Sequence, residues 1–81
     1  MKYHYVYILV SVNDPETHYV GRTQDLESRL ARHNNGECTH TSKYRPWRIE
    51  TAIAFTSLEK AVAFEKYLKS GSGREFARRR F

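Results

Sequence analysis

The sequence predicts a small α+β domain whose elements follow the order β-β-α-β-α, with a short helix at the C-terminal end. Two observations predict it. Segments rich in β-branched and aromatic residues are separated by turn formers, and helix start and stop signals bound the segments that lie between and after them. With 81 residues, the chain has room for one domain, spanning residues 1–81. A hydrophobic share of 40%, including 14% aromatic residues, excludes general disorder.

Two strands are expected at the start of the chain. Residues 3–11 are β-branched and aromatic throughout, and period-two alternation places Tyr5 and Tyr7 on one face. Both faces are mainly apolar, so we expect this strand in the interior of the sheet with other elements packed on each side. A turn at residues 13–16 precedes a second extended segment at residues 18–21. An antiparallel hairpin is the simplest connection between the two.

The middle of the chain predicts a helix, a loop and a third strand. Residues 23–35 carry two cap candidates, Thr23 and Asp25, and end at the helix stop signal Asn34-Asn35-Gly36. Residues 36–47 show no periodicity, which predicts a polar loop. Residues 48–55 are again rich in β-branched residues, which is typical of a strand.

Two capping patterns predict the last two helices. Thr56-Ser57-Leu58-Glu59 fits a capping box in which Thr56 and Glu59 satisfy each other's backbone donors, and the helix is expected to run to about Ser70. The pattern recurs at Ser72-Gly73-Arg74-Glu75, from which we expect a short final helix ending at residues 78–80.

Charge and cysteine content narrow the class of protein. Fourteen Lys and Arg against nine Asp and Glu give a net charge of +5, which favours a polyanionic partner such as nucleic acid. The single cysteine, Cys38, cannot form an internal disulfide, so we expect a reducing compartment. We find neither a signal peptide nor an apolar segment of the roughly 20 residues that a membrane span requires. These features together predict a cytoplasmic protein that does not act at a membrane.

One carboxylate lies where an apolar side chain is expected. A rotation of about 100° per residue places Glu65 in the arc of the second helix that it shares with Leu58, Ala61, Val62 and Leu68, so that it points at the sheet. A buried carboxylate without a partner costs several kcal/mol, so a cationic group is expected to face it. A purely structural ion pair is the alternative to a functional site.

The first helix offers the cationic partners. Leu26 and Leu30 mark its inward stripe, and Arg29 and His33 lie beside it as an i, i+4 pair that can reach one site. Taken singly, Arg29 is compatible with a solvated surface arginine, and His33 with a hydrogen-bonded histidine near the helix end. Their convergence with Glu65 beside tyrosine-rich strands favours a site.

The polar positions, in order, resemble a known family. Tyr5-Val6-Tyr7 and, a dozen residues later, Tyr19-Val20-Gly21 are similar to the paired motif of the GIY-YIG nuclease domain. The resemblance continues through Arg22-Thr23, Asp25-Leu26, Arg29-Leu30, His33-Asn34, Glu65 and Leu68-Lys69. Tyr5 departs from the pattern, since the motif begins with glycine. The chain most resembles the small stand-alone bacterial members, which are similar to the nuclease domain at the N-terminus of an excinuclease subunit.

The resemblance implies a three-stranded antiparallel sheet flanked by helices, and hydrolysis of a phosphodiester bond with a single divalent metal ion, Mg²⁺ or Mn²⁺, held by Glu65. It implies that Tyr7 and Tyr19 activate or orient the attacking water, that Arg29 neutralises charge in the transition state, and that His33 contacts the phosphate or shares the proton transfer. Gly21 is expected to let the backbone lie close to the scissile strand. Further DNA contacts are expected from Arg22, Arg45, Arg48 and Lys69.

The resulting prediction is a metal-dependent DNA endonuclease. We expect it to act on branched, nicked or damaged DNA in repair or recombination, as a monomer or weak homodimer, with no particular protein partner indicated. Two alternatives stay open: a nucleic-acid-binding module that keeps the fold without turnover, and a protein-interaction domain whose basic surface is incidental. The second has no evident need for Glu65 on an apolar helix face.

Overall fold

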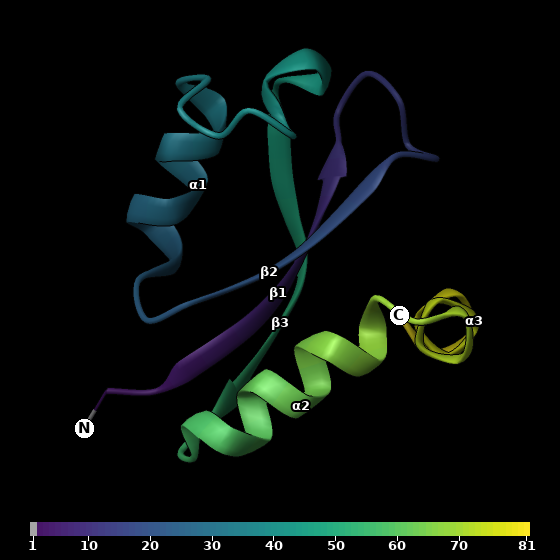
Figure 1. Cartoon of the computed structure of the whole chain (residues 1–81). Helices are drawn as coiled ribbons and strands as arrows, with labels where there is room; N and C mark the ends of the chain where they lie inside the picture. The colour runs from purple at the N-terminus through teal and green to yellow at the C-terminus, as the bar shows by residue number, and fades with distance from the viewer. Residues whose placement is uncertain (1) are drawn as a thin grey trace.

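A computed structural model describes residues 2–81 and confirms the predicted fold class and element order (Figure 1). Three antiparallel strands form one sheet in the order β2-β1-β3, with β2 and β3 at its two edges. The strands are β1 (His4–Ser11), β2 (His18–Thr23) and β3 (Trp47–Phe55). The helices are α1 (Leu26–Asn34), α2 (Leu58–Leu68) and α3 (Gly71–Arg80), and the α1–β3 loop contains a short 3-10 turn, Ser42–Tyr44.

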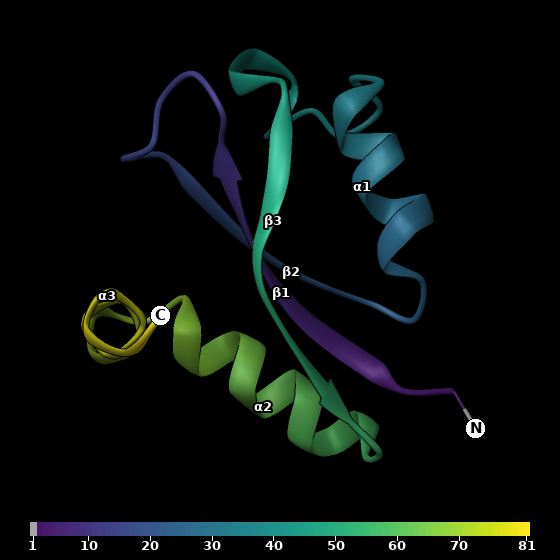
Figure 2. The ribbon, with the colours of Figure 1, turned by 180° about the vertical axis from the view of Figure 1, so that it is seen from behind.

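The central strand β1 is buried on both faces, as its two apolar faces predict. Figures 1 and 2 show α1 on one side of the twisted sheet and α2 on the other. On the α1 side, Tyr7, Leu9 and Trp47 form a buried cluster. On the α2 side, Val6 and Ile8 pack against α2 and α3. Each face of β1 therefore belongs to a different core, and β2 and β3 also contribute side chains to both cores.

Two of the predicted helix caps are wrong in position. The cap of α2 is Ser57, whose hydroxyl accepts a hydrogen bond from Lys60 N at 3.3 Å, and not Thr56. The cap of α3 is Ser70, which accepts from Gly73 N at 3.1 Å, so this helix begins before the predicted Ser72. In both places two hydroxyl residues lie within two positions of each other, and the extended backbone of Ser57 and Ser70 decides which of them caps. For α1, the candidate Asp25 is confirmed as the cap.

The corner between α2 and α3 depends on Gly73, which is buried. A Cβ atom there would collide with the carbonyl group of Tyr67 and come within 2.6 Å of Leu68 Cα, both of which are backbone atoms that cannot rotate away. We therefore expect Gly73→Ala to lower the free energy of unfolding by about 3 kcal/mol, as overpacking does in other cores.

A matched control lies two residues earlier in the same helix. A Cβ atom added at Gly71 would have no other atom within 4 Å, so Gly71→Ala is expected to change the unfolding free energy by less than about 1 kcal/mol. Urea denaturation followed by circular dichroism measures both variants. Equal effects of the two substitutions would contradict the packing explanation.

Candidate active site

A chain of hydrogen bonds begins at Tyr7 in the centre of the sheet. The Tyr7 hydroxyl is 2.9 Å from Nε2 of His33, and Nδ1 of His33 is 2.7 Å from the Thr41 hydroxyl. Because the Thr41 hydroxyl donates its proton to the Cys38 carbonyl, its oxygen accepts from His33 Nδ1–H. This leaves Nε2 of the neutral imidazole to accept the proton of Tyr7. Tyr7 and His33 are 2% and 1% exposed.

Two side chains, those of Asn34 and Trp47, fix the position of Thr41 at the far end of this series of hydrogen bonds. Asn34, next to His33, donates from Nδ2 to the Trp47 carbonyl at 3.0 Å and accepts from Trp47 N at 2.6 Å, which fixes the end of α1 to the start of β3. The Trp47 indole in turn donates to the Thr41 carbonyl at 2.8 Å. Thr41 was not predicted as a site residue, because its position depends on these long-range bonds and not on any local pattern.

Burial and a nearby arginine set the protonation of the pair. Desolvation raises the pKa of Tyr7 to about 12, although the guanidinium of Arg29 beside it acts in the opposite direction. Desolvation lowers the pKa of His33, and the charges of Arg29 and Arg32 lower this pKa further. Near neutral pH, Tyr7 is therefore a protonated donor and His33 a neutral acceptor.

Tyr19 and Gly21 lie on the same face of the sheet as Tyr7. The Tyr19 ring packs against the His33 ring with 5.1 Å between centroids. Gly21 is directly opposite Tyr7 in the β1–β2 register. A Cβ at position 21 would lie 2.5 Å from Tyr7 Cζ, so the space that we expected to accommodate a substrate strand is filled by the Tyr7 ring. Glycine is needed here to accommodate the phenol.

Glu65 reaches the sheet from α2 with 19% of its side chain exposed. Its Oε1 accepts from Arg22 Nε at 3.1 Å, and its Oε2 accepts from Lys69 Nζ at 3.0 Å. The expected cation is therefore present, but the prediction that α1 supplies it is wrong. Alternation along β2 turns Arg22 away from the Tyr7 face and toward α2.

The predicted apolar arc around Glu65 is also narrower than expected. Leu58 and Val62 are 48% and 40% exposed, and α2 packs through Ala61 and Leu68, which are buried. Because α2 is packed through so narrow a stripe, Glu65 lies at the border of the contact with the sheet, where water and ligands can reach it.

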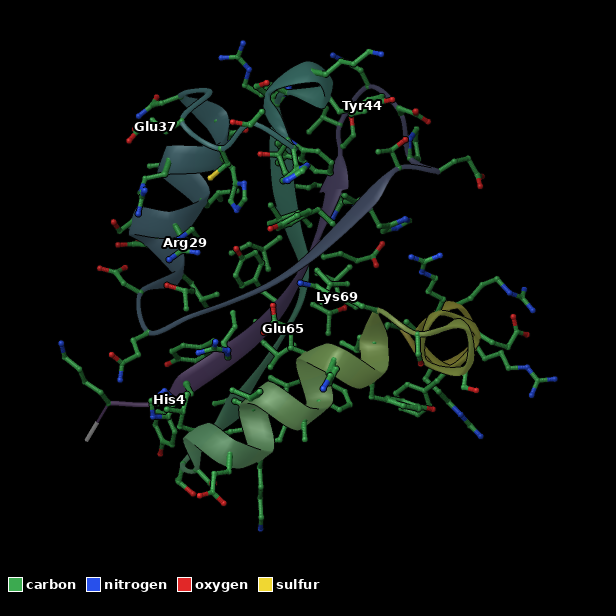
Figure 3. The ribbon with its side chains drawn as sticks, viewed as in Figure 1. His4, Arg29, Glu37, Tyr44, Glu65 and Lys69 are labelled. Atoms are coloured by element: carbon green, nitrogen blue, oxygen red, sulfur yellow. The ribbon has the colours of Figure 1, made fainter. Side chains whose placement is uncertain are left out.

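The two groups of residues meet at the edge strand β2. Tyr7, Tyr19, Arg29 and His33 are gathered on the α1 side, while Glu65 lies on the α2 side. Arg22 links them, since its carbonyl accepts from Arg29 Nη1 at 3.5 Å and its side chain binds Glu65. Figure 3 shows Arg29 on α1, and Glu65 on α2 with Lys69 just after its end, on opposite sides of β2. The candidate site is therefore assembled around the outer edge of the sheet.

Two of the other predicted DNA contacts lie elsewhere. Arg45 is in the loop before β3, where its Nε donates to the Ser42 carbonyl at 2.7 Å. Arg48 is exposed on β3, the edge of the sheet opposite to β2. The structure thus places Arg22 and Lys69 at the candidate site, and Arg45 and Arg48 away from its β2 edge.

The donor set is compatible with a hydrated hard cation. Within residues 2–81, there is no group of three His, Cys, Asp or Glu side chains that could enclose a metal ion. Mg²⁺, however, commonly keeps several waters and binds through one or two carboxylates together with substrate phosphates. Glu65, partly exposed at the border of α2, fits that role and would hold such an ion together with phosphate oxygens and water.

The chain matches the model of the GIY-YIG catalytic domain over residues 3–79, and it belongs to this family of nuclease domains. Two small bacterial proteins are similar to it over most of their length. The UPF0213 protein of Lactococcus lactis subsp. cremoris is 34% identical over 70 residues, covering 85% of this chain and 69% of that protein. The UPF0213 protein BH0048 of Halalkalibacterium halodurans is 34% identical over 73 residues, covering 89% and 76%.

A solved structure and a longer enzyme subunit are also similar. The solution NMR structure of the UPF0213 protein BH0048 from Bacillus halodurans has a TM-score of 0.56 at 32% identity, covering 94% of this chain and 80% of that one. The structure-specific endonuclease subunit SLX1 of Debaryomyces hansenii is 37% identical over 71 residues, which are 79% of this chain and 20% of the subunit.

Within the described residues, none of the helices is both long enough and apolar enough to cross a bilayer.

Proposed function

We propose that this protein is a metal-dependent endonuclease that hydrolyses phosphodiester bonds in branched, nicked or damaged DNA, with a role in DNA repair or recombination in the cytoplasm. The observation that carries the proposal is the hydrogen-bonded chain Tyr7–His33–Thr41, with Arg29 beside it and Glu65 across the edge strand. Membership of a nuclease family supports it, as does the similarity to a subunit named as a structure-specific endonuclease.

The chain of hydrogen bonds provides a path for one proton. The attacking water gives a proton to the Tyr7 oxygen as Tyr7 passes its own proton to Nε2 of His33, and the water oxygen forms a bond to phosphorus. The bond from phosphorus to the leaving oxygen breaks, and that oxygen takes up a proton from a second water. The protonated His33 then releases its extra proton to solvent, where it neutralises the hydroxide that remains. Thr41 holds the imidazole in the tautomer that can accept, so no free phenolate is needed despite the raised pKa of Tyr7.

Positively charged groups are expected to stabilise the negative charge that develops in the transition state. Arg29 is half-buried beside Tyr7, where its guanidinium can neutralise the phosphate oxygens as negative charge develops. A divalent ion held by Glu65 would polarise the phosphate and stabilise the leaving oxygen. Tyr19, packed on His33, keeps the imidazole oriented.

One observation favours a second candidate, a nucleic-acid-binding module without turnover. Both oxygens of Glu65 are bonded to cations, Arg22 and Lys69, which neutralise the carboxylate. In that case Glu65 would only position two phosphate-binding side chains.

A cleavage assay tests the proposal and separates the two candidates. Supercoiled, nicked and branched DNA are incubated with the protein in Mg²⁺, in Mn²⁺ or in EDTA. We expect cleavage of at least one substrate with metal, complete loss in EDTA, and recovery when metal is added back in excess. Salt-sensitive binding without cleavage of any substrate would support the binding module, and cleavage that persists in EDTA would overturn the role of the metal.

A further inference from the structure

Two surface hollows lie beside β2. One is lined by residues at its C-terminal end, and the other extends from its N-terminal residues across the sheet to Glu50 of β3. The first, which we name the α1 hollow, has a volume of about 570 Å³, and its basic lining residues are Lys2, Arg22, Arg29 and Arg32. The other, the α3 hollow, has a volume of about 720 Å³ and is bordered on its basic side by Lys69, Arg74 and Arg78. Each is large enough for one or more nucleotide units.

Glu65 lines neither hollow, but its carboxylate is held between one basic residue of each. Arg22 lines the α1 hollow and donates to Oε1 of Glu65, while Lys69 lines the α3 hollow and donates to Oε2. Each hollow thus contributes one of the two cations that hold this carboxylate. A ligand that contacted Arg22 in one hollow and Lys69 in the other would lie beside Glu65, and Figure 3 shows Glu65 and Lys69 close together near β2.

The α1 hollow carries a strong excess of positive charge. Four cationic side chains line it together with His4, against one carboxylate, Asp25. That carboxylate is engaged as the cap of α1, where Oδ1 accepts from Ser28 N at 3.1 Å. Arg32 is 3.7 Å from Glu37, a pair in which both side chains are about half exposed and therefore weakly held. The hollow suits phosphate groups.

The α3 hollow combines cations with an apolar floor. Its three cations face two carboxylates, Glu16 and Glu50, of which Glu50 is paired with His18 at 3.2 Å. The floor includes Val20, Leu68 and Ala77, and the ring of Phe81, 43% exposed, borders it. Phosphates alone gain nothing from an apolar lining, whereas unpaired bases stack on aromatic rings, which Tyr19 and Phe81 supply here, while their backbone follows the cations.

We propose that one strand of the DNA substrate follows the outer edge of β2, with paired nucleotides at the α1 hollow and an unpaired segment in the α3 hollow. This inference rests on the proposed function, since Glu65 would then face the scissile phosphate. Four residue steps along β2, from Arg22 to His18, cover about 13 Å, or about four nucleotides of one B-form strand. The substrate class is therefore a duplex with a single-stranded extension, cut near the junction.

The helix α3 provides a charge-matched test. Arg74 and Arg78 line the α3 hollow, whereas Arg79 and Arg80 in the same helix are not among its lining residues. The pairs R74Q/R78Q and R79Q/R80Q each remove two charges, and each removes one ion pair with Glu75, from Arg78 or from Arg79. Any difference in DNA affinity between the two double variants therefore reflects the position of the arginines and not the net charge of the protein.

Binding is measured by fluorescence anisotropy in EDTA, from 50 to 200 mM salt, on a labelled duplex with a single-stranded extension and on the same duplex with blunt ends. We expect R74Q/R78Q to weaken binding to the extended duplex about tenfold and to reduce the salt slope by about 1.4, with less than about twofold loss for R79Q/R80Q. On the blunt duplex, the two variants should bind alike. Arg32→Gln should weaken binding to both DNAs, and Lys60→Gln, on the exposed first turn of α2, to neither.

Equal losses for the two arginine pairs would overturn the proposal, because net charge alone would then explain them. Unchanged binding of R74Q/R78Q to the extended duplex would assign the α3 hollow to another ligand, such as an acidic protein, and would also overturn it. Because binding is measured in EDTA, failure of the nuclease function is distinguishable. A protein that cleaves no DNA but shows the expected binding differences would contradict the proposed nuclease activity. The proposed position of the DNA strand along β2 would still hold.

Discussion

Replacing Glu65 by glutamine should reduce DNA cleavage by on the order of 1000-fold, because a metal ion contributes several kcal/mol of transition-state stabilisation and each 1.4 kcal/mol is a factor of ten. The substitution keeps the length of the side chain and an oxygen that can accept from Arg22. The ion pairs of Glu65 are partly exposed, with Arg22 37% accessible, so their loss should cost less than about 1 kcal/mol of stability. A large loss of rate is thus expected with a nearly unchanged fold.

The matched control is Glu59→Gln, which removes a carboxylate from the exposed first turn of the same helix. Initial cleavage rates in Mg²⁺, together with thermal unfolding of both variants, give the comparison. If the Glu65→Gln protein cleaves at the normal rate, the contacts of Glu65 with Arg22 and Lys69 have only a structural role. Loss of folding in this variant alone would show that the two ion pairs contribute more to stability than their exposure indicates.

The course of the strands was predictable because local pattern and burial agree. Residues 3–11 are apolar on both faces, and β1 is accordingly the central strand with a separate core on each side. The helix stop at Asn34-Asn35-Gly36 also coincides with the end of α1. Cap positions were less predictable where Thr56 and Ser57, or Ser70 and Ser72, offer similar hydroxyls, since the choice depends on the angle at which the chain leaves the sheet.

The candidate site was predictable in composition but not in arrangement. The helical spacing of Arg29 and His33 correctly places both near Tyr7, because an i, i+4 pair shares one face. The predicted partner of Glu65, a cation on α1, was wrong because a helical wheel gives the direction of a side chain only relative to its own helix. Which strand residue it meets depends on the twist of the sheet and on Arg22 pointing to the α2 side. Thr41 lies in a loop positioned by Asn34 and Trp47, which no local pattern reveals.

The arrangement of the site around β2 has a consequence for catalysis. The hydrogen-bonded residues Tyr7 and His33 lie on one side of the edge strand and the Glu65 carboxylate on the other, so the proposed mechanism requires both sides. Only a ligand that wraps the edge of β2 contacts both. In the proposed mechanism, cleavage is therefore expected to depend on a DNA shape that can contact both sides of this edge.

Tyr7→Phe is the second substitution with a large expected effect, a loss of about 100-fold in cleavage rate, as is typical when a proton-transfer group is removed. The phenyl ring still fills the space beside Gly21, so packing of the sheet is retained. The hydroxyl, however, is the donor to Nε2 of His33, and leaving that buried nitrogen without a partner should lower stability by about 1–3 kcal/mol. Tyr67→Phe, at a 41% exposed tyrosine on α2, is the control for the same chemical change.

A dependence on pH distinguishes a proton path from a structural role of Tyr7. His33 accepts a proton only when it is neutral, and burial lowers its pKa, so the cleavage rate should rise as pH increases through that lowered pKa and then level off. In Tyr7→Phe the remaining activity should lack this rise, because His33 no longer exchanges a proton with the site. A variant that is slower but keeps the same pH profile would show that the hydroxyl only positions His33, and the water would then need another acceptor.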